Sequence, residues 1–404
     1  MAQTNVPIGS PTAKKVYSVA VFSETQRKPS LRRNLVGPAP KQSAAEKKLR
    51  GQTSEDYPIV RVTDLQNTAG DTVSVDLFNI IKGKPTMGDR KIAGRMMALK
   101  TSSLDVRIDQ YRGGVDQGGR MTQQRTVHQL RGIAKGNLAG WAARLEDQLC
   151  MTHIAGARGF DEAEDWVVPL ETDEEFDEIV VNPVQPPTPN RRLLGGDATG
   201  ASDIDSADKM TLEMIDELRL QLDEMAFPMQ PIRLPEDPAV DEQPLYCLIL
   251  SPRQWHDLQT QTGDNAWRTF LANAYQRANG WSHPLFSGNP GMWNGILVKK
   301  MYRPIRFNAG DPVRESDAAG NVSSTNANTK FDRGVLLGAQ ALAEVYGKDN
   351  GSGYYANWHE ETSDHGNTVE HSVSFMGGKR KTRFKGSNGE WTDHGVYAVD
   401  TAVS

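Results

Sequence analysis

The sequence has few of the features that mark secreted or membrane proteins. It contains two cysteines, Cys150 and Cys247, among 404 residues, which excludes a disulfide framework and favours a reducing compartment. Its longest uninterrupted apolar run, residues 245–250, is far shorter than the ~18 residues that a membrane-spanning helix requires. The N-terminus carries basic residues but no apolar signal-peptide core. We therefore expect a soluble protein that is made inside the cell and has no membrane partner.

Motifs of catalysis are also missing. The sequence has no Gly-x-Ser-x-Gly nucleophile elbow. The hexapeptide GSGYYA at residues 351–356 follows a predicted helix and precedes none, so it does not fit a dinucleotide site. GKPT at residues 83–86 has a proline where a phosphate-binding loop has its Lys-Ser/Thr pair. We predict that the protein is not an enzyme, with no catalytic residue and no cofactor.

One cluster of histidines and acids remains to be weighed. His359 and His365 are six residues apart, not the four that place two metal ligands on one helix face. Gly366-Asn367 indicates a turn, and His371 follows it, so exposed strands joined by a turn are the simpler interpretation. We predict no metal here. A metal-dependent cytoplasmic enzyme that uses His359, His365 and His371 stays open as an alternative.

The charge is distributed unevenly. The net charge of −5 argues against a general nucleic-acid binder, but residues 1–60 hold ten basic residues against four acidic ones. We predict an extended N-terminal arm over residues 1–56, because this segment has too little apolar periodicity to fold alone. Residues 161–178 contain ten acids, and residues 159–190 contain no Lys or Arg, which predicts an exposed acidic insertion over residues 159–208.

Two interpretations of these charges stay open. Both segments can be solvated surface, or the arm can lie near a polyanion or an acidic neighbour while the acidic insertion points away from it. A DNA-binding accessory protein that acts through the basic arm is therefore a second alternative function.

Alternating apolar residues predict a long two-stranded ribbon within residues 57–110. Val73 and Val75 alternate with polar residues, and so do Leu104 and Val106. About 25 mostly polar residues join the two strands, which is long for a loop inside a compact domain. Because an isolated ribbon is marginally stable, we expect something else, such as a second copy of the chain, to cover its apolar face. The basic residues of the connecting segment are candidates for contacts between subunits: Lys84, Arg90, Lys91 and Arg95.

A long helix is predicted from about residue 122 to residue 154. Apolar residues recur at helical spacing for more than five turns, and thirty residues would form a rod about 45 Å long. Gly132, Gly136 and Gly140 share another face of this helix, although each interior glycine costs about 0.8–1 kcal/mol relative to alanine. The face is either a tolerated weakness or, as we prefer, a flat surface that a second backbone approaches closely.

The rest of the chain mixes helices and strands without a β-α-β rhythm, so we predict an α+β fold. Helices are expected near residues 212–222, 252–258, 266–278 and 336–346, the second of them capped by Ser251 with Pro252 at its first position. Strands are expected at residues 245–250, at 295–300 and 302–307 as a pair, and along 369–399.

This order of parts resembles the major capsid protein of tailed bacteriophages with the Hong Kong 97-type shell fold. The most similar group is the capsid family of podoviruses related to coliphage N-four. The resemblance is carried by short strings in the same order and spacing: GDTVSVDL at residues 70–77, IDQYR at 108–112, MTQQRT at 121–126, AGARG at 155–159, SPRQWHDL at 251–258, LLGAQA at 336–341 and DHGN at 364–367.

The resemblance implies a role for each part. Residues 1–56 would be the N-terminal arm, 57–110 the extended loop with its flanking strands, and 111–158 the spine helix of a peripheral domain. The acidic insertion would follow over 159–208, residues 209–335 would lead into an axial domain, and 336–404 would supply strands that return to the peripheral domain.

The implied function is assembly. The chain would bind itself in pentamers and hexamers that form an icosahedral head around packaged double-stranded DNA. Its other partners would be portal, scaffolding or decoration proteins. It would be found in the virion after assembly in the host cytoplasm.

Overall fold

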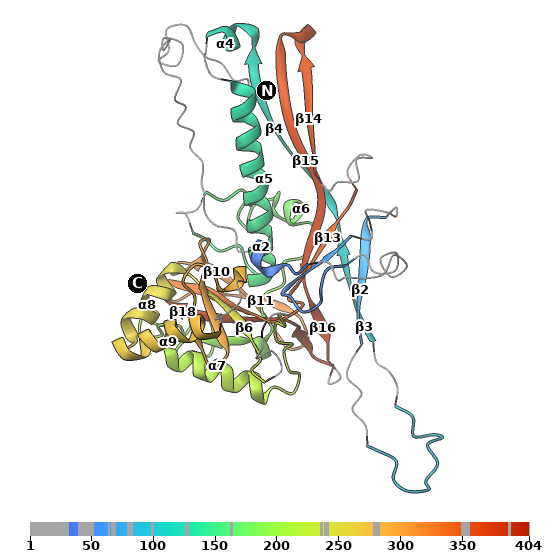
Figure 1. The fold of residues 1–404 in the computed structure, drawn as a ribbon, viewed down its shortest axis with the longest axis vertical. Coiled ribbons are helices and arrows are strands. Elements are labelled where there is room, and N and C mark those ends of the chain that lie inside the picture. The colour runs from blue at the N-terminus through green and yellow to red at the C-terminus, as the bar shows by residue number, and fades with distance from the viewer. Residues whose placement is uncertain are drawn as a thin grey trace.

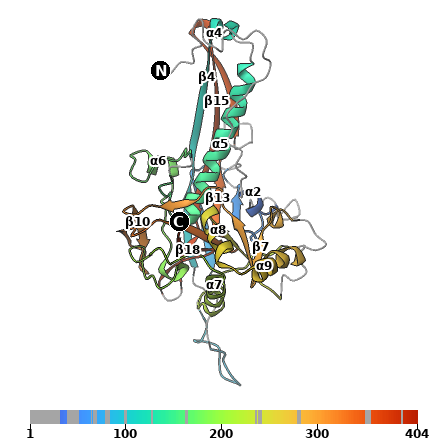
Figure 2. The ribbon, with the colours of Figure 1, turned by 90° about the vertical axis from the view of Figure 1, so that its left-hand side faces the viewer.

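The fold has an elongated part and a compact part (Figures 1 and 2). Most of the predicted arm and residues 351–355 of the glycine-rich hexapeptide lie outside the residues described here. The computed structural model describes residues 32–38, 52–63, 65, 70–78, 84–97, 101–125, 129–161, 165–234, 237, 242–277, 283–348, 356–386 and 389–403.

The elongated part consists of one long helix on a five-stranded sheet (Figure 1). Helix α5 (Leu130–Ala155) has 26 residues and is therefore about 39 Å long. It ends at Gly156, which adopts a positive φ of 70° and lies so close to the carbonyl oxygen of Gln185 that a Cβ there would be 2.3 Å from it. The long helix predicted from the apolar stripe is confirmed for this range, and a separate short helix, α4 (Arg120–Arg125), precedes it.

The sheet beneath α5 contains the predicted strands near the histidine cluster. Its order is β1-β13-β15-β14, with β4 paired to β15. The hairpin of β14 and β15, joined by the turn η4 (Asp364–Gly366), confirms the strand-turn-strand interpretation. The strands are β1 (Ile59–Val62), β4 (Asp109–Gly119), β13 (Leu342–Tyr346), β14 (Ala356–Ser363) and β15 (Thr368–Lys381).

The compact part is built on a seven-stranded mixed sheet of order β5-β18-β12-β6-β8-β7, with β9 paired to β12. Helix α8 begins as predicted, because Ser251 and Gln254 form a capping box and Pro252 is its first residue. The strands are β5 (Arg192–Leu194), β6 (Tyr246–Leu250), β7 (Gly291–Trp293), β8 (Ile296–Lys300), β9 (Ile305–Phe307), β12 (Phe331–Leu337) and β18 (Val396–Ala402). The helices around it are α7 (Leu212–Glu224), α8 (Pro252–Gln261) and α9 (Asp264–Arg277).

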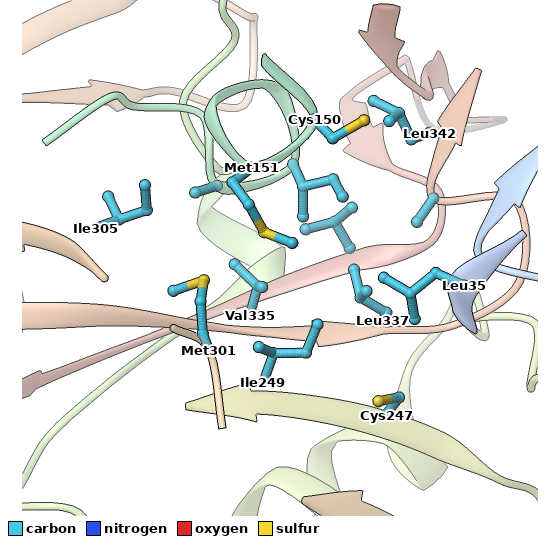
Figure 3. Packing of buried hydrophobic residues seen from close by; sticks show 14 of the residues in the cluster. Leu35, Cys150, Met151, Cys247, Ile249, Met301, Ile305, Val335, Leu337 and Leu342 are labelled. Carbon is cyan, nitrogen blue, oxygen red and sulfur yellow. The ribbon is translucent and has the colours of Figure 1, made fainter. Parts of the chain in front are cut away.

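The core of the compact part has one apolar cluster on each face of this sheet. Alternate residues of β6 enter the two clusters, so the whole strand is buried and reads as a continuous apolar run. The last turns of α5 join one cluster: Met151 points toward Val335 of the sheet, and Cys150 lies beside Leu342 of β13 (Figure 3). The long helix is therefore anchored in the compact part.

The predicted ribbon is present, but one expectation about it is wrong. Strands β2 (Thr72–Phe78) and β3 (Thr101–Arg107) pair antiparallel, and residues 84–97 project away from the body (Figure 1). Leu104 and Val106 are buried, and Val106 belongs to an apolar cluster with Val62 and Val345 of the chain's own sheet. The base of the ribbon is thus covered within one molecule and needs no second copy for that purpose.

Two secondary-structure predictions are corrected. Residues 336–346 are not a helix but the end of β12 and the whole of β13, both buried on both faces, which is why their apolar run was ambiguous. Strands β8 and β9 exist but do not pair with each other. Strand β8 lies between β6 and β7, whereas β9 pairs with β12.

The acidic segment over residues 159–208 is not an exposed insertion. It supplies β5 to the seven-stranded sheet, and Phe176 and Val180 of helix α6 (Phe176–Val180) are buried beside Leu145 and Leu149 of α5. Runs of acids flank Phe176, so the high acidic content concealed the apolar residues that pack against α5.

The C-terminal part that we expect over residues 336–404 is divided between the two sheets. Within residues 336–404, strands β13, β14 and β15 lie in the sheet beneath the long helix, in line with the expected return to it, but β18 pairs with β12 and β5 in the compact part. The other elements of the described residues are α2 (Arg32–Leu35), η2 (Pro189–Arg191), η3 (Pro284–Phe286), β10 (Pro312–Ser316), β11 (Val322–Asn326), β16 (Arg383–Lys385) and β17 (Trp391–Asp393).

Candidate interaction surfaces

Part of the N-terminal arm is fastened to the long helix by a buried ion cluster. Arg32 Nη1 lies 2.8 Å from Glu146 Oε2 on α5, and Arg32 Nε donates to Glu344 Oε1 on β13 at 2.8 Å. Arg61 and Lys379 also face Glu344, at 2.7 and 3.6 Å. Burial alone would raise the pKa of Glu344, but Lys379, Arg32 and Arg61 together lower it to about 2. The cluster joins the arm, the helix and the sheet.

A second buried ion cluster fixes the end of α5 to the compact part. Arg333 and Asp400 are fully buried and form a two-bond pair at 2.7 and 2.9 Å. Arg333 Nη1 also donates to the carbonyl oxygen of Ala155, the last residue of α5, at 3.2 Å. Arg192 Nε lies 3.0 Å from Asp400. Burial would raise the pKa of Asp400, but Arg333 and Arg192 lower it. These contacts join the end of α5 to β12 and β18 of the compact part.

Sequence reasoning missed both clusters. Glu344 stands inside an otherwise apolar run, and a charge in such a position is the signal that could have indicated a buried partner, whereas Arg333 follows another charged residue, Asp332, and carries no such signal. The partners themselves could not be named, since Arg32 and Glu344 are 312 positions apart.

The four basic residues predicted to make subunit contacts lie together on the projecting segment 84–97. Lys84, Arg90, Lys91 and Arg95 are all exposed. Exposed apolar side chains accompany them: Met87 at 68%, Ile92 at 61%, Met96 at 80% and Met97 at 49%. An exposed group of large apolar side chains is typical of an interaction site.

The three glycines of the long helix lie on an open face. Gly132, Gly136 and Gly140 are exposed, and a Cβ built on any of them would meet no atom of the described chain within 4 Å. The opposite side of the same helix carries the buried Ala134 and Leu138. The glycine face is therefore free to approach something outside the described part of this chain.

The histidine cluster does not form a metal centre in the described residues. His371 is buried, stacks on Trp358 at 5.3 Å and has its Nε2 2.9 Å from Gln117 Oε1, whereas the His359 side chain is 70% exposed. His365 lies in the turn η4 with a positive φ of 51°. Within the described ranges, no group of three or more His, Cys, Asp or Glu is placed to hold a metal ion. Also within those ranges, none of the helices has the length and hydropathy needed to cross a membrane.

Comparison with known proteins identifies the fold. The family model of the phage capsid protein matches residues 5–404. The major capsid protein of Pseudomonas phage KPP25 is 25% identical over 363 residues, which cover 87% of this chain and 89% of that protein.

Solved capsid structures are similar over the full length. The capsid of Ralstonia phage GP4 has 26% sequence identity and a TM-score of 0.75, with 100% of this chain and 99% of that chain covered. The capsid of cyanophage Pam1 shares the fold, with a TM-score of 0.62, 18% identity, and coverage of 100% and 99%. The fold is thus a mixed α+β phage capsid fold. The chain belongs to the phage capsid protein family, and its function is that of a major capsid protein that forms the shell of a phage head.

Proposed function

We propose that copies of this chain assemble, through contacts with one another, into a closed icosahedral head of the Hong Kong 97 type. The head would consist of pentamers and hexamers, enclose double-stranded DNA without sequence preference, and form in the host cytoplasm. Within that type we place the chain nearest the podoviruses related to coliphage N-four. Portal, scaffolding or decoration proteins would be its other partners.

One observation carries this proposal: the ribbon of β2 and β3 ends in a segment that leaves the body of its own molecule. Residues 84–97 project into solvent with four large exposed apolar side chains and four basic ones (Figure 1). A group of large exposed apolar side chains marks a surface that contacts another molecule. A contact between two different surfaces of identical chains propagates from copy to copy and can close into a shell.

Each part of the fold would have its own role in the shell. Residues 1–56 would lie along neighbouring subunits, held to their own chain at Arg32. Helix α5 and the five-stranded sheet would form the peripheral domain, and the seven-stranded sheet with α7, α8 and α9 the axial domain. The axial domain would include β5 and β18, so the division that we expected from the sequence at residues 209 and 336 is revised.

Expression of the chain alone, followed by sedimentation velocity and negative-stain electron microscopy, tests the proposal. We expect shells, rings or sheets of subunits that are far larger than the 44.5 kDa monomer. A stable monomer or dimer at high concentration would contradict it. Deletion of residues 1–56 should mainly impair assembly, whereas loss of a salt-sensitive DNA affinity as the main effect would favour the DNA-binding alternative.

A further inference from the structure

We propose that the basic segment 84–97 of one copy binds the acidic surface around helix α6, residues 170–178, of a neighbouring copy. The inference rests on the proposed function, because it requires that copies meet in a shell. It goes further by naming both surfaces and the chemistry between them, and it can fail while the shell function stands.

Residues 84–97, which we call the donor surface, are mainly positively charged. Residues 84–97 contain four basic residues and one acid, Asp89, so the segment carries a charge of +3. Turns at Gly88 and Gly94, with φ of 61° and 83°, fold the segment into a short projection. Among the described contacts, its only backbone hydrogen bond is the one from Arg95 to the Ile92 carbonyl oxygen, at 2.9 Å. Its charges and methionines are therefore available to another molecule.

Residues 170–178, which we call the acceptor surface, expose acids because α6 packs its apolar residues inward. Phe176 and Val180 point inward and are 2% and 1% exposed, whereas Asp177 and Glu178 between them are exposed. Glu171 is already used, since it accepts from the backbone of Arg158 at 3.0 Å and pairs with Arg314 at 3.3 Å. Five exposed acids are left on this surface: Asp173, Glu174, Glu175, Asp177 and Glu178.

The two surfaces match in charge and in apolar character. The acidic surface also exposes Leu170, at 38%, so it offers an apolar contact for methionines, whose flexible side chains adapt to irregular surfaces. Opposite potentials on two faces accelerate their encounter and fix the register of the contact.

The donor and acceptor surfaces of one chain are too far apart to contact each other. Figures 1 and 2 both show α6 on the flank of α5, whereas residues 84–97 project from the far end of the ribbon. The two segments of one chain therefore lie apart, so a second copy of the chain is the partner that we infer.

Charge reversal tests the pairing. Lys91→Glu/Arg95→Glu reverses the donor, Glu174→Lys/Glu178→Lys reverses the acceptor, and a chain with all four changes restores complementarity. We expect each double variant to assemble roughly tenfold less at equal concentration, and the fourfold variant to recover most of the loss. A control matched to the Lys91/Arg95 variant, Arg268→Glu/Lys348→Glu, changes the net charge by the same amount and in the same direction at two exposed positions elsewhere. Circular dichroism should show that every variant is folded.

Each outcome decides the question. Recovery in the fourfold variant supports the pairing. Normal assembly of the double variants, no recovery in the fourfold variant, or an equal loss in the control overturns it, while wild-type shells in the same experiment leave the proposed function intact. A wild-type chain that never assembles overturns both.

A disulfide experiment gives a second readout. With Arg90→Cys and Glu178→Cys in one chain, mild oxidation of assembled particles should link neighbouring copies into multimers on a non-reducing gel. The natural Cys150 and Cys247 are buried and should not interfere. A pairing of Arg90→Cys with Glu213→Cys, an exposed position on α7, should not cross-link, and equal cross-linking there would overturn the proposal.

Discussion

Replacing Arg32 by methionine removes the charge that connects the N-terminal arm to the long helix. The side chain is buried, and its guanidinium contacts two carboxylates, those of Glu146 and Glu344. Methionine fills much of the same volume but leaves both carboxylates without this partner. The two carboxylates are not affected equally, because Glu344 keeps Arg61 and Lys379.

The expected loss in the free energy of unfolding follows from the burial of Glu146. This residue is 7% exposed, and among the described contacts its remaining donor is the hydroxyl of Tyr346, 3.3 Å from Oε1. Removing one partner of a buried ion pair costs about 3–5 kcal/mol, since the other charge is left desolvated. We expect Arg32→Met to lower the free energy of unfolding by about 3 kcal/mol. The double variant Arg32→Met/Glu146→Gln should lose about 1–2 kcal/mol less, because it removes the stranded charge as well.

Urea unfolding of the unassembled chain measures these differences, and hydrogen exchange of residues 32–38 shows whether the arm has left the helix. Exchange should rise in the single variant before global unfolding. A loss below about 1 kcal/mol for Arg32→Met, or strictly additive losses for the two substitutions, would refute the reasoning that the cluster couples arm and helix.

Three further predictions concern other parts of the fold. Gly136→Leu should leave the monomer folded, because open space surrounds the position, but should block assembly if the glycine face of α5 is a close contact; unchanged particles would make the glycines a tolerated weakness. Burial lowers the pKa of His153 to about 3, so the histidine stays neutral in the folded chain, and its contribution to stability is complete above pH 6.5 and falls as the pH drops toward 3. Between pH 7 and pH 5, the wild-type chain should therefore lose about 2 kcal/mol more than His153→Gln in urea unfolding, and equal losses would contradict this. Ser251→Ala should cost about 0.5–2 kcal/mol in the same assay, since Ser251 accepts from the Gln254 backbone at 3.1 Å, and no change would show that the cap is dispensable.

Local patterns predicted those elements that have one clear apolar face. The alternation around Val75 and Val106 indicated β2 and β3, and the stripe through Leu138 indicated α5. The Ser251-Pro252 pair indicated the start of α8, because a cap is a signal that needs no distant partner.

The failures have a common physical cause, which is long-range burial. Residues 336–346 form strands that are buried on both faces, and such a run has no periodicity that distinguishes it from a helix. The acidic segment was expected to be exposed because its charges outnumber Phe176 and Val180, yet these two residues decide how it packs. The cluster of Arg32, Glu146 and Glu344 depends on three distant parts of the chain, so no local window contains it.

The candidate site was predicted in part. Lys84, Arg90, Lys91 and Arg95 were selected from the length and charge of their segment, and the structure brings them together on one projection. Whether they contact another subunit stays a prediction, as it does for Gly132, Gly136 and Gly140. The acidic surface around α6 could not be proposed as a binding surface before its apolar side was known to be buried.

The most direct measurement is an electron cryomicroscopy reconstruction of particles assembled from this chain. The account predicts a closed icosahedral shell in which residues 84–97 of every subunit lie against an adjacent subunit. Particles in which this projection contacts only its own chain, or a purified protein that yields no particles under any condition of concentration and salt, would contradict it.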